Sequence, residues 1–316
     1  MDIVHEDKIT DKVREYYKTG GGSTFYVGYK SLARHYSIKE GGCTDWTGYA
    51  GSGKTELLLD ILKNCSEWYG HKHLIHMPDA GSIEEVIGKL IHKLTGRQFE
   101  EFHYNEQGAR VINDNRISIG DVEKTIPRVL ESFKILDPMT KNSSKALTPK
   151  EFWEFAVINK KKLGIFSAVI DSWNYMRHDT EGFAREDKWL EDTLSYRNEL
   201  AEKSNLHFHT IIHPTKARKD SEGKTVPPDI HSLKGGSEWG NNGKSIIVVD
   251  RNFESKISDI VIAKAKPSIV GVRGNASLSY DVKKGNYFEY IDGVKYGAEP
   301  LIQPQNNIIT SPNLEF

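Results

Sequence analysis

A glycine-rich segment, Gly48-Tyr49-Ala50-Gly51-Ser52-Gly53-Lys54-Thr55, is the stretch of this chain whose residue types most clearly define a chemistry. It satisfies the phosphate-binding pattern G-x-x-x-x-G-K-[ST] at every fixed position. Glycines accept positive φ angles, so backbone N–H groups can turn inward around phosphate oxygens. Lys54 then reaches the terminal phosphates, and Thr55 offers a hydroxyl to Mg²⁺. We predict that this loop, with the next residue Glu56, binds ATP and Mg²⁺.

An acid at the end of an apolar run supplies the second half of such a site. Residues 164–170 are mostly apolar and predict a buried parallel strand, and Asp171 follows them directly. A carboxylate in this place holds Mg²⁺ opposite the phosphate loop. We therefore predict a metal site made by Thr55 and Asp171. No second acid adjoins Asp171, so the group that orients the attacking water must come from elsewhere in the chain.

Two further side chains are predicted at the same edge of a parallel sheet. Asp79 follows a strand at 73–77, and His213 ends another strand. Both are candidates for the chemistry, because ligands bind at the carboxyl ends of strands in open α/β sheets. Asp79 would polarise the attacking water, and a histidine beside the terminal phosphate could sense its loss. Glu84 and Glu85 are better explained by a capping box at the start of a helix.

The elements that must position these residues alternate between strands and helices. This alternation predicts an α/β fold with a mostly parallel, twisted sheet and helices on both faces. Two late strands around Lys284-Gly285-Asn286 predict a C-terminal antiparallel hairpin. We expect an N-terminal helix and glycine linker at 1–23, an ATPase domain at 24–300 and a C-terminal tail at 301–316.

The N-terminal helix is predicted at 8–18 and has its apolar residues on one face. Gly20-Gly21-Gly22-Ser23 follows it and reads as a flexible joint. The helix could pack on the core of its own chain. Alternatively, it is an arm that packs on a neighbouring subunit, because three glycines release it from the body. The sequence leaves both arrangements open.

Composition bounds the class of protein. The 316 residues include 28% charged and 37% hydrophobic residues, which is ordinary for a globular protein. No apolar run approaches the ~20 residues that span a bilayer, and no secretory signal is visible, so we expect a cytoplasmic protein of a bacterial or phage-infected cell. Cys43 and Cys65 cannot build a disulfide framework. A net charge of −1 excludes a broadly basic surface but permits nucleic acid binding by local loops.

The order of the motifs resembles the RecA-like motor domain of ring-shaped replicative helicases, of the Twinkle, phage primase-helicase and DnaB type. The resemblance covers about residues 24–292. It rests on the phosphate loop, on Asp79 after the second strand, and on segments that are specific when taken together: Ile170-Asp171-Ser172-Trp173-Asn174, Ile212-His213-Pro214-Thr215-Lys216, Asp229-Ile230-His231-Ser232-Leu233-Lys234-Gly235-Gly236-Ser237 and Ser245-Ile246-Ile247-Val248-Val249-Asp250-Arg251-Asn252.

The resemblance implies roles for the matching positions. Asp79 takes the place of the family's catalytic glutamate, with a shorter side chain. His213 corresponds to the phosphate sensor that couples hydrolysis to the DNA loop behind it. Arg251 and Tyr280 match positions that sandwich the adenine ring. The loop that lines the central channel and holds single-strand phosphates is matched by Lys234, Gly235, Gly236 and Ser237.

In this family an arginine finger from the neighbouring subunit, within a Lys-x-Arg element, completes the site. This chain has Lys264-Ala265-Lys266 in that place, and a lysine cannot offer a planar fork of donors. Arg273 is the nearest alternative. The resemblance therefore implies Lys264, Lys266 or Arg273 as the catalytic cation supplied in trans.

Together these features predict an ATP-hydrolysing replicative DNA helicase motor that translocates on single-stranded DNA, in the 5′-3′ direction by resemblance. We expect a homo-oligomeric ring, most simply a hexamer, with a primase or loader as a further partner and no membrane contact. One alternative is a RecA-like protein that uses ATP as a switch for single-strand binding or recombination and forms open filaments. Another is a packaging or loader ATPase that acts on duplex DNA or on protein.

Overall fold

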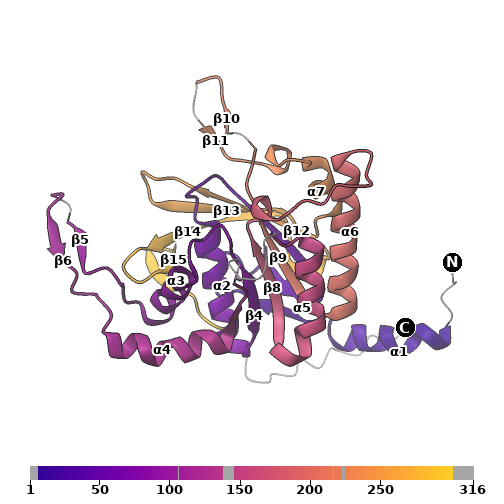
Figure 1. Cartoon of the computed structure of the whole chain (residues 1–316), viewed down its shortest axis with the longest axis horizontal. Helices are drawn as coiled ribbons and strands as arrows, with labels where there is room; N and C mark the ends of the chain where they lie inside the picture. The colour runs from indigo at the N-terminus through magenta and orange to yellow at the C-terminus, as the bar shows by residue number, and fades with distance from the viewer. Residues whose placement is uncertain (1–5, 106, 138–145, 216, 223–224, 302–316) are drawn as a thin grey trace.

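A large twisted sheet organises the chain, and its central strands are parallel (Figure 1). The computed structural model describes residues 6–105, 107–137, 146–215, 217–222 and 225–301. Within these residues the sheet has ten strands in the order β16-β15-β14-β13-β12-β3-β9-β8-β4-β7. The parallel part consists of β12 (Ser245–Arg251), β3 (Cys43–Thr47), β9 (His207–Ile212), β8 (Ile165–Asp171), β4 (Lys72–His76) and β7 (Phe133–Ile135).

The C-terminal part of the sheet is antiparallel. The predicted hairpin is present as β14 (Gly274–Asp281) and β15 (Asn286–Ile291). It is extended on one side by β13 (Ile257–Lys264), which pairs with β12, and on the other by β16 (Val294–Gly297). The predicted α/β fold with a C-terminal antiparallel hairpin is therefore confirmed, and the antiparallel region is larger than one hairpin.

Helices cover both faces of the sheet and give the molecule two apolar cores. One core lies under α2 (Lys54–Tyr69), α3 (Ile83–Thr95) and α4 (Ile119–Ser132). The other lies under α5 (Pro149–Leu163), α6 (Glu186–Ser204) and α7 (Gly236–Asn242). Alternate residues of β8 divide between them: Val169 enters the first core, and Ala168 and Ile170 enter the second. This two-sided burial explains why the strand reads as a continuous apolar run.

The starts of the helices follow local rules that were visible in the sequence. Ser82 caps α3 and forms a capping box with Glu85. Thr148 caps α5 in the same way, with Pro149 in its first turn. Glu85 is thereby used by its helix end, as predicted, and is not part of the catalytic group. Two short hairpins lie outside the large sheet among the described residues: β5 (Phe102–Tyr104) with β6 (Arg110–Ile112), and β10 (Arg218–Lys219) with β11 (Thr225–Val226).

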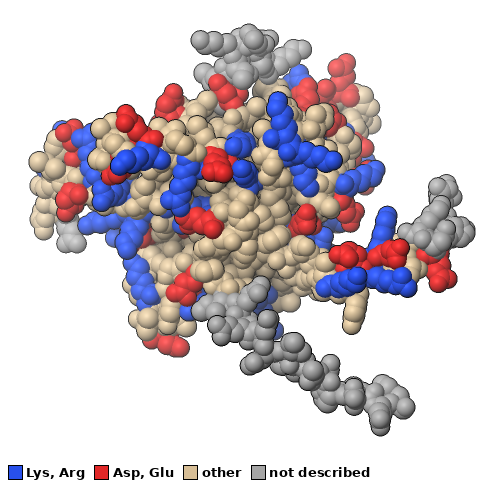
Figure 2. Space-filling view, turned by 90° about the horizontal axis from the view of Figure 1, so that it is seen from below, with Lys and Arg blue, Asp and Glu red and all other residues tan. Residues whose placement is uncertain are grey.

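The N-terminal helix α1 (Glu6–Lys18) stands away from the body of the molecule, as Figures 1 and 2 both show. Its apolar face is exposed: Val13, Tyr16 and Tyr17 are 55%, 56% and 85% accessible. A helix docked on its own core would bury these side chains. In the described part of the chain, no helix has both the length and the apolar character to cross a membrane. The tail predicted at 301–316 lies outside the described residues from position 302 onward.

Candidate nucleotide-binding site

The phosphate loop connects β3 to α2, and its glycines are required by its shape. Gly48, Gly51 and Gly53 have φ angles of 156°, 75° and 92°. A Cβ atom on Gly48 would lie 2.2 Å from the carbonyl oxygen of Val249, and one on Gly53 would lie 2.4 Å from the hydroxyl of Tyr287. The loop therefore sits against two strands of the sheet, and its N–H groups and the N-terminus of α2 face one volume at the carboxyl edge.

The lysine and threonine of the loop meet the predicted metal-binding acid. The Lys54 ammonium group lies inside the loop and donates to the carbonyl oxygens of Gly48 and Tyr49, both at 2.9 Å. The Thr55 hydroxyl donates to Oδ2 of Asp171 at 2.6 Å, across 116 positions of the sequence. Asp171 is 2% exposed, and this burial raises its pKa to about 6, against the lowering effect of the Thr55 hydrogen bond. The structure thus brings the acid predicted for the metal directly to the loop.

Asp79 and His213 join this group at the same edge. The Nε2 atom of His213 lies 3.3 Å from Oδ2 of Asp79. One ligand atom from each of Asp79, Asp171 and His213 lies within 4.8 Å of the others. Burial and the charge of Lys54 lower the pKa of His213, against the opposing effect of Asp79, so the imidazole is neutral at pH 7. The convergence predicted from strand ends is present in the fold.

Two residues that the sequence analysis did not select hold this cluster in place. Oδ1 of Asn174 accepts the backbone N–H of His213 at 2.8 Å and so links the segment after β8 to the end of β9. The hydroxyl of Tyr175 is hydrogen-bonded to Asp79, and this bond raises the pKa of Tyr175. Both follow Asp171 within four residues, a position that marks them once the strand end is known.

The residues present fit a magnesium–triphosphate group. Ser52 Oγ is buried in the loop and has no hydrogen-bond partner among the described residues, so it is available to a phosphate oxygen. Thr55 and Asp171 form the hard oxygen pair that Mg²⁺ prefers. Lys54 supplies a positive charge whose pKa is lowered by burial, opposed by Asp171 and Asp79. Each donor or ligand that a phosphate loop requires is therefore in place.

The residues predicted around the base occupy different positions. Arg251 ends β12 beside the loop, and its guanidinium group lies 5.6 Å from the ring centre of Phe253. Phe253 is 68% exposed, and its ring lies 3.7 Å from the place of a Cβ on Gly51, so it is the aromatic residue at the rim. Tyr280 packs on Tyr287 instead. The structure brings Arg251 to the loop but does not pair it with Tyr280.

The side chain of Glu56 points toward α3 rather than into the loop. Lys93 makes an ion pair with its carboxylate at 2.7 Å, and the Tyr280 hydroxyl donates to the same oxygen, Oε2, at 3.1 Å. The charge of Lys93, aided by Lys89, lowers the pKa of Glu56 against the effect of burial. The predicted role of Glu56 is thus reduced to its backbone N–H at the start of α2, while its side chain ties α2 to α3 and β14.

The predicted strand-binding segment is the start of a helix. Gly235 caps α7 with φ of 72°, and Gly236 and Ser237 form its first turn. Lys234 makes an ion pair with Glu186 of α6 at 2.7 Å, and its side chain is 69% exposed. The segment is therefore packed in the body of the domain and is not a free loop. Its contact with DNA remains a prediction.

A projecting hairpin between His213 and α7 is a second candidate that the sequence analysis missed. Figure 1 shows β10 and β11 extending from the sheet on the side away from α1. The Tyr49 hydroxyl of the phosphate loop donates to the carbonyl oxygen of Val226 in β11 at 3.0 Å, so this hairpin is linked directly to the nucleotide site. The basic residues of the segment were the available signal: Lys216, Arg218, Lys219 and Lys224.

The three candidates for the trans cation lie at the opposite, amino edge of the sheet. Lys264 ends β13 and pairs in register with Ile246 near the start of β12. Lys266 lies just beyond, and Arg273 precedes the start of β14. The phosphate loop follows the far end of β3, so none of the three is placed to act on the nucleotide of its own chain.

Comparisons with known proteins agree with this geometry. No protein-family model matches the chain. It is 22% identical over 288 residues to the Twinkle homolog protein, chloroplastic/mitochondrial, of Arabidopsis thaliana, a match that covers 88% of this chain. The chain spans only 38% of the length of that relative.

Solved helicase structures share the fold. The isolated ATPase domain of one DnaB-like helicase superposes with a TM-score of 0.67 at 16% identity, over 90% of this chain and 99% of that one. A second DnaB-like replicative helicase, studied with its interactions with primase, gives 0.65 at 17% identity, over 91% and 67%. The chain therefore has the RecA-like fold of DnaB-type helicase ATPase domains, and the predicted resemblance is confirmed at the level of the fold.

Proposed function

We propose that this protein is an ATP-hydrolysing motor that translocates on single-stranded DNA and separates duplex strands during replication. The observation that carries the proposal is the convergence of Lys54, Thr55, Asp171, Asp79 and His213 at one sheet edge, in a fold shared with helicase ATPase domains. Its ligands would be ATP and Mg²⁺, as the donor set of the loop requires.

The residues of the cluster divide the chemistry among them. Lys54 and the loop N–H groups neutralise charge on the β and γ phosphates, and Thr55 with Asp171 holds the metal ion. Asp79 orients the attacking water and accepts its proton. His213, neutral and within 3.3 Å of Asp79, contacts the γ-phosphate region and changes its hydrogen bonding when that group leaves. Phe253 and Arg251 offer a stacking surface for the adenine.

His213 also connects hydrolysis to the strand. The chain runs directly from His213 into the segment that carries β10 and β11 and then into α7. We infer that Lys219 on this hairpin contacts the phosphates of single-stranded DNA, together with or in place of Lys234. A change at the γ-phosphate would move the hairpin through His213 and through the Tyr49–Val226 hydrogen bond.

The motor works as a ring of identical copies. Its cations at the amino edge cannot reach the phosphate loop of the same chain, so Lys264, Lys266 or Arg273 would complete the site of a neighbour. The exposed apolar face of α1 supports the same arrangement, because an arm that packs on the next copy would bury Tyr16 and Tyr17. A primase or a loader is a further expected partner, and the compartment in which the protein works stays a prediction.

The test combines three measurements on the wild-type chain. We expect ATP hydrolysis that is stimulated severalfold by single-stranded DNA, unwinding of a forked duplex with a 5′ tail, and the mass of a ring when nucleotide is present. Hydrolysis that ignores single-stranded DNA would contradict the proposal and favour a packaging or loader ATPase. Open filaments on single-stranded DNA without unwinding would favour a recombination-type switch protein. Unwinding only with a 3′ tail would reverse the proposed polarity.

A further inference from the structure

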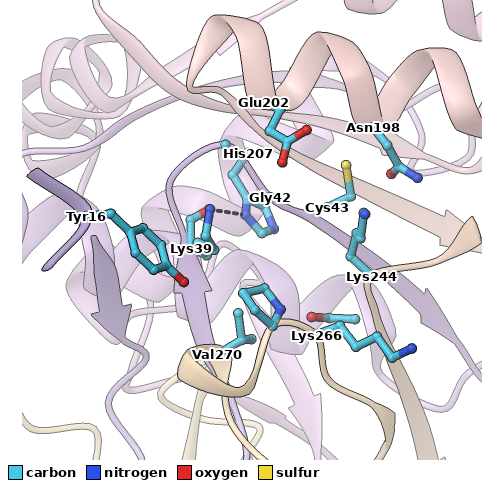
Figure 3. A pocket seen from close by; sticks show the side chains of 13 residues that line it. Tyr16, Lys39, Gly42, Cys43, Asn198, Glu202, His207, Lys244, Lys266 and Val270 are labelled. Atoms are coloured by element: carbon cyan, nitrogen blue, oxygen red, sulfur yellow. Dashed lines mark hydrogen bonds between the residues drawn. The ribbon is translucent and has the colours of Figure 1, made fainter. Parts of the chain in front are cut away.

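A cavity of about 440 Å³ lies at the amino edge of the sheet, on the side opposite the phosphate loop (Figure 3). Cys43, His207 and Ser245, the first residues of β3, β9 and β12, form its floor. The other walls come from α6, from the turn after β13 and from Tyr16 at the end of α1. No residue of the proposed catalytic cluster lines this cavity.

Lysine side chains dominate the lining. Lys39 is tied to the carbonyl oxygen of Glu40 at 3.0 Å. Lys244 and Lys266 are exposed, and neither makes an ion pair or hydrogen bond with any described residue. Figure 3 shows them on the same side of the cavity, beneath Asn198. Glu202 is the acidic residue that lines the cavity in the described part of the chain, and it lies above His207 in the same view.

A third lysine beside them is held by the fold. The Lys264 ammonium group donates to the carbonyl oxygens of Gly240 and Asn241, at 2.6 and 3.2 Å, at the end of α7. Burial lowers the pKa of Lys264, and the positive charges of Lys266 and Lys244 lower it further, so the three ammonium groups lie within electrostatic range of one another. Lys264 is thus a fixed charge, whereas Lys244 and Lys266 are free to reach outward.

The nearest carboxylate does not compensate these charges. Asp45 is 1% exposed and is held by two hydrogen bonds from Arg197, including one of 3.1 Å from Nη2 to Oδ2. A bidentate pair of this kind satisfies both carboxylate oxygens. Like charges gathered at one edge repel each other, and an anion brought from outside would relieve that repulsion.

We propose that Lys244 and Lys266 together supply the two positive charges that contact the γ-phosphate of a nucleotide bound by the neighbouring copy. An arginine offers two donors from one planar group, whereas each lysine offers a single compact charge, so two lysines are needed to replace the fork. Lys264 acts as a positioning residue that fixes the end of β13. This inference rests on the proposed function, since the anion is the triphosphate of another copy in the ring.

The first experiment compares single variants in the assembled protein. Lys244→Ala should lower turnover at saturating ATP about tenfold to hundredfold, a part of the 10³–10⁵ that a complete finger provides. The affinity for ATP should change little, because the phosphate loop is intact. Lys244→Arg should keep most of the activity. Lys39→Ala is the matched control: it lines the same cavity, is already bonded to Glu40, and should leave turnover unchanged.

A mixing experiment separates action in trans from a structural role. Lys54→Ala copies cannot hydrolyse ATP but carry an intact Lys244, and Lys244→Ala copies carry an intact phosphate loop. Mixed rings should therefore recover turnover above the sum of the two separate preparations. Absence of recovery, or a Lys244→Ala protein as active as Lys39→Ala, would overturn the inference while the proposed function stands. A wild-type chain that does not hydrolyse ATP would instead overturn the proposed function.

Discussion

The carboxyl and amino edges of the large sheet hold opposite charges in opposite settings. At the carboxyl edge, Asp171 is buried and bonded to Thr55, and Asp79 lies against His213. At the amino edge, Lys244 and Lys266 are exposed and have no partner among the residues that the structure describes. A buried carboxylate must be stabilised by its own chain, whereas an exposed ammonium group is stabilised by water until an anion arrives.

This contrast indicates a site that is built in two halves. The carboxyl edge carries everything that binds a nucleotide, and the amino edge carries charges that only another molecule can use. Changes at the first edge should therefore affect every assembly state, and changes at the second should affect the assembled protein alone. The predictions that follow test this division, beginning with the largest expected effect.

Replacement of Lys54 by Ala should remove hydrolysis by a hundredfold or more, about what the loss of one essential charge at a reacting group causes. The effect should be the same in isolated and assembled protein, because Lys54 acts within its own chain. ATP turnover and nucleotide affinity are the measurements, with Lys72→Ala as the control, a lysine paired with Glu131 on the far side of the sheet. Retained turnover in Lys54→Ala would show that the loop is not the catalytic site.

A smaller effect should distinguish the two candidate strand-binding elements at the carboxyl edge. Lys219→Ala should weaken single-strand binding severalfold and reduce the slope of log affinity against log salt by about 1, as for the loss of one phosphate contact. Lys234→Ala should do less, because Glu186 already pairs with Lys234. Binding titrations at several salt concentrations measure both. A larger loss with Lys234→Ala would return the contact to the segment first predicted.

The smallest effect concerns acid stability and the amino side of the sheet. His73 and His207 are fully buried near the starts of β4 and β9, and burial lowers their pKa values to about 3 and about 4. Nδ1 of His207 donates to the carbonyl of Lys39, and Nε2 of His73 donates to that of Leu62, so each ring is bonded in its neutral form.

The unfolded chain binds protons at these histidines below about pH 6.5, and the folded chain does not until about pH 4 or lower. Stability should therefore fall as pH falls, by about 2 kcal/mol for each histidine between about pH 7.5 and pH 5. Urea unfolding at several pH values measures this slope. In His207→Gln the slope should be smaller by the share of one histidine, and an unchanged slope would contradict the assignment.

Local features were the part of the fold that could be predicted. Strand β8 was predicted from its apolar run, and α3 and α5 from Ser82 and Thr148, since a capping residue and its partner lie within one turn. The exposed hairpin β10–β11 was not predicted, because its short strands have no apolar face and therefore no periodic pattern.

The candidate site shows the same division between local and distant information. The phosphate loop is a local motif, and the sequence by itself determined its position, its glycines, its lysine and the acid at the end of β8. The tertiary structure alone decided that His213 lies against Asp79, that Phe253 rather than Tyr280 stands at the rim, and that Lys244 shares a cavity with Lys266. A backbone turn is specified by neighbouring residues, whereas a contact across many positions depends on the order in which strands pair, and no local pattern encodes that order.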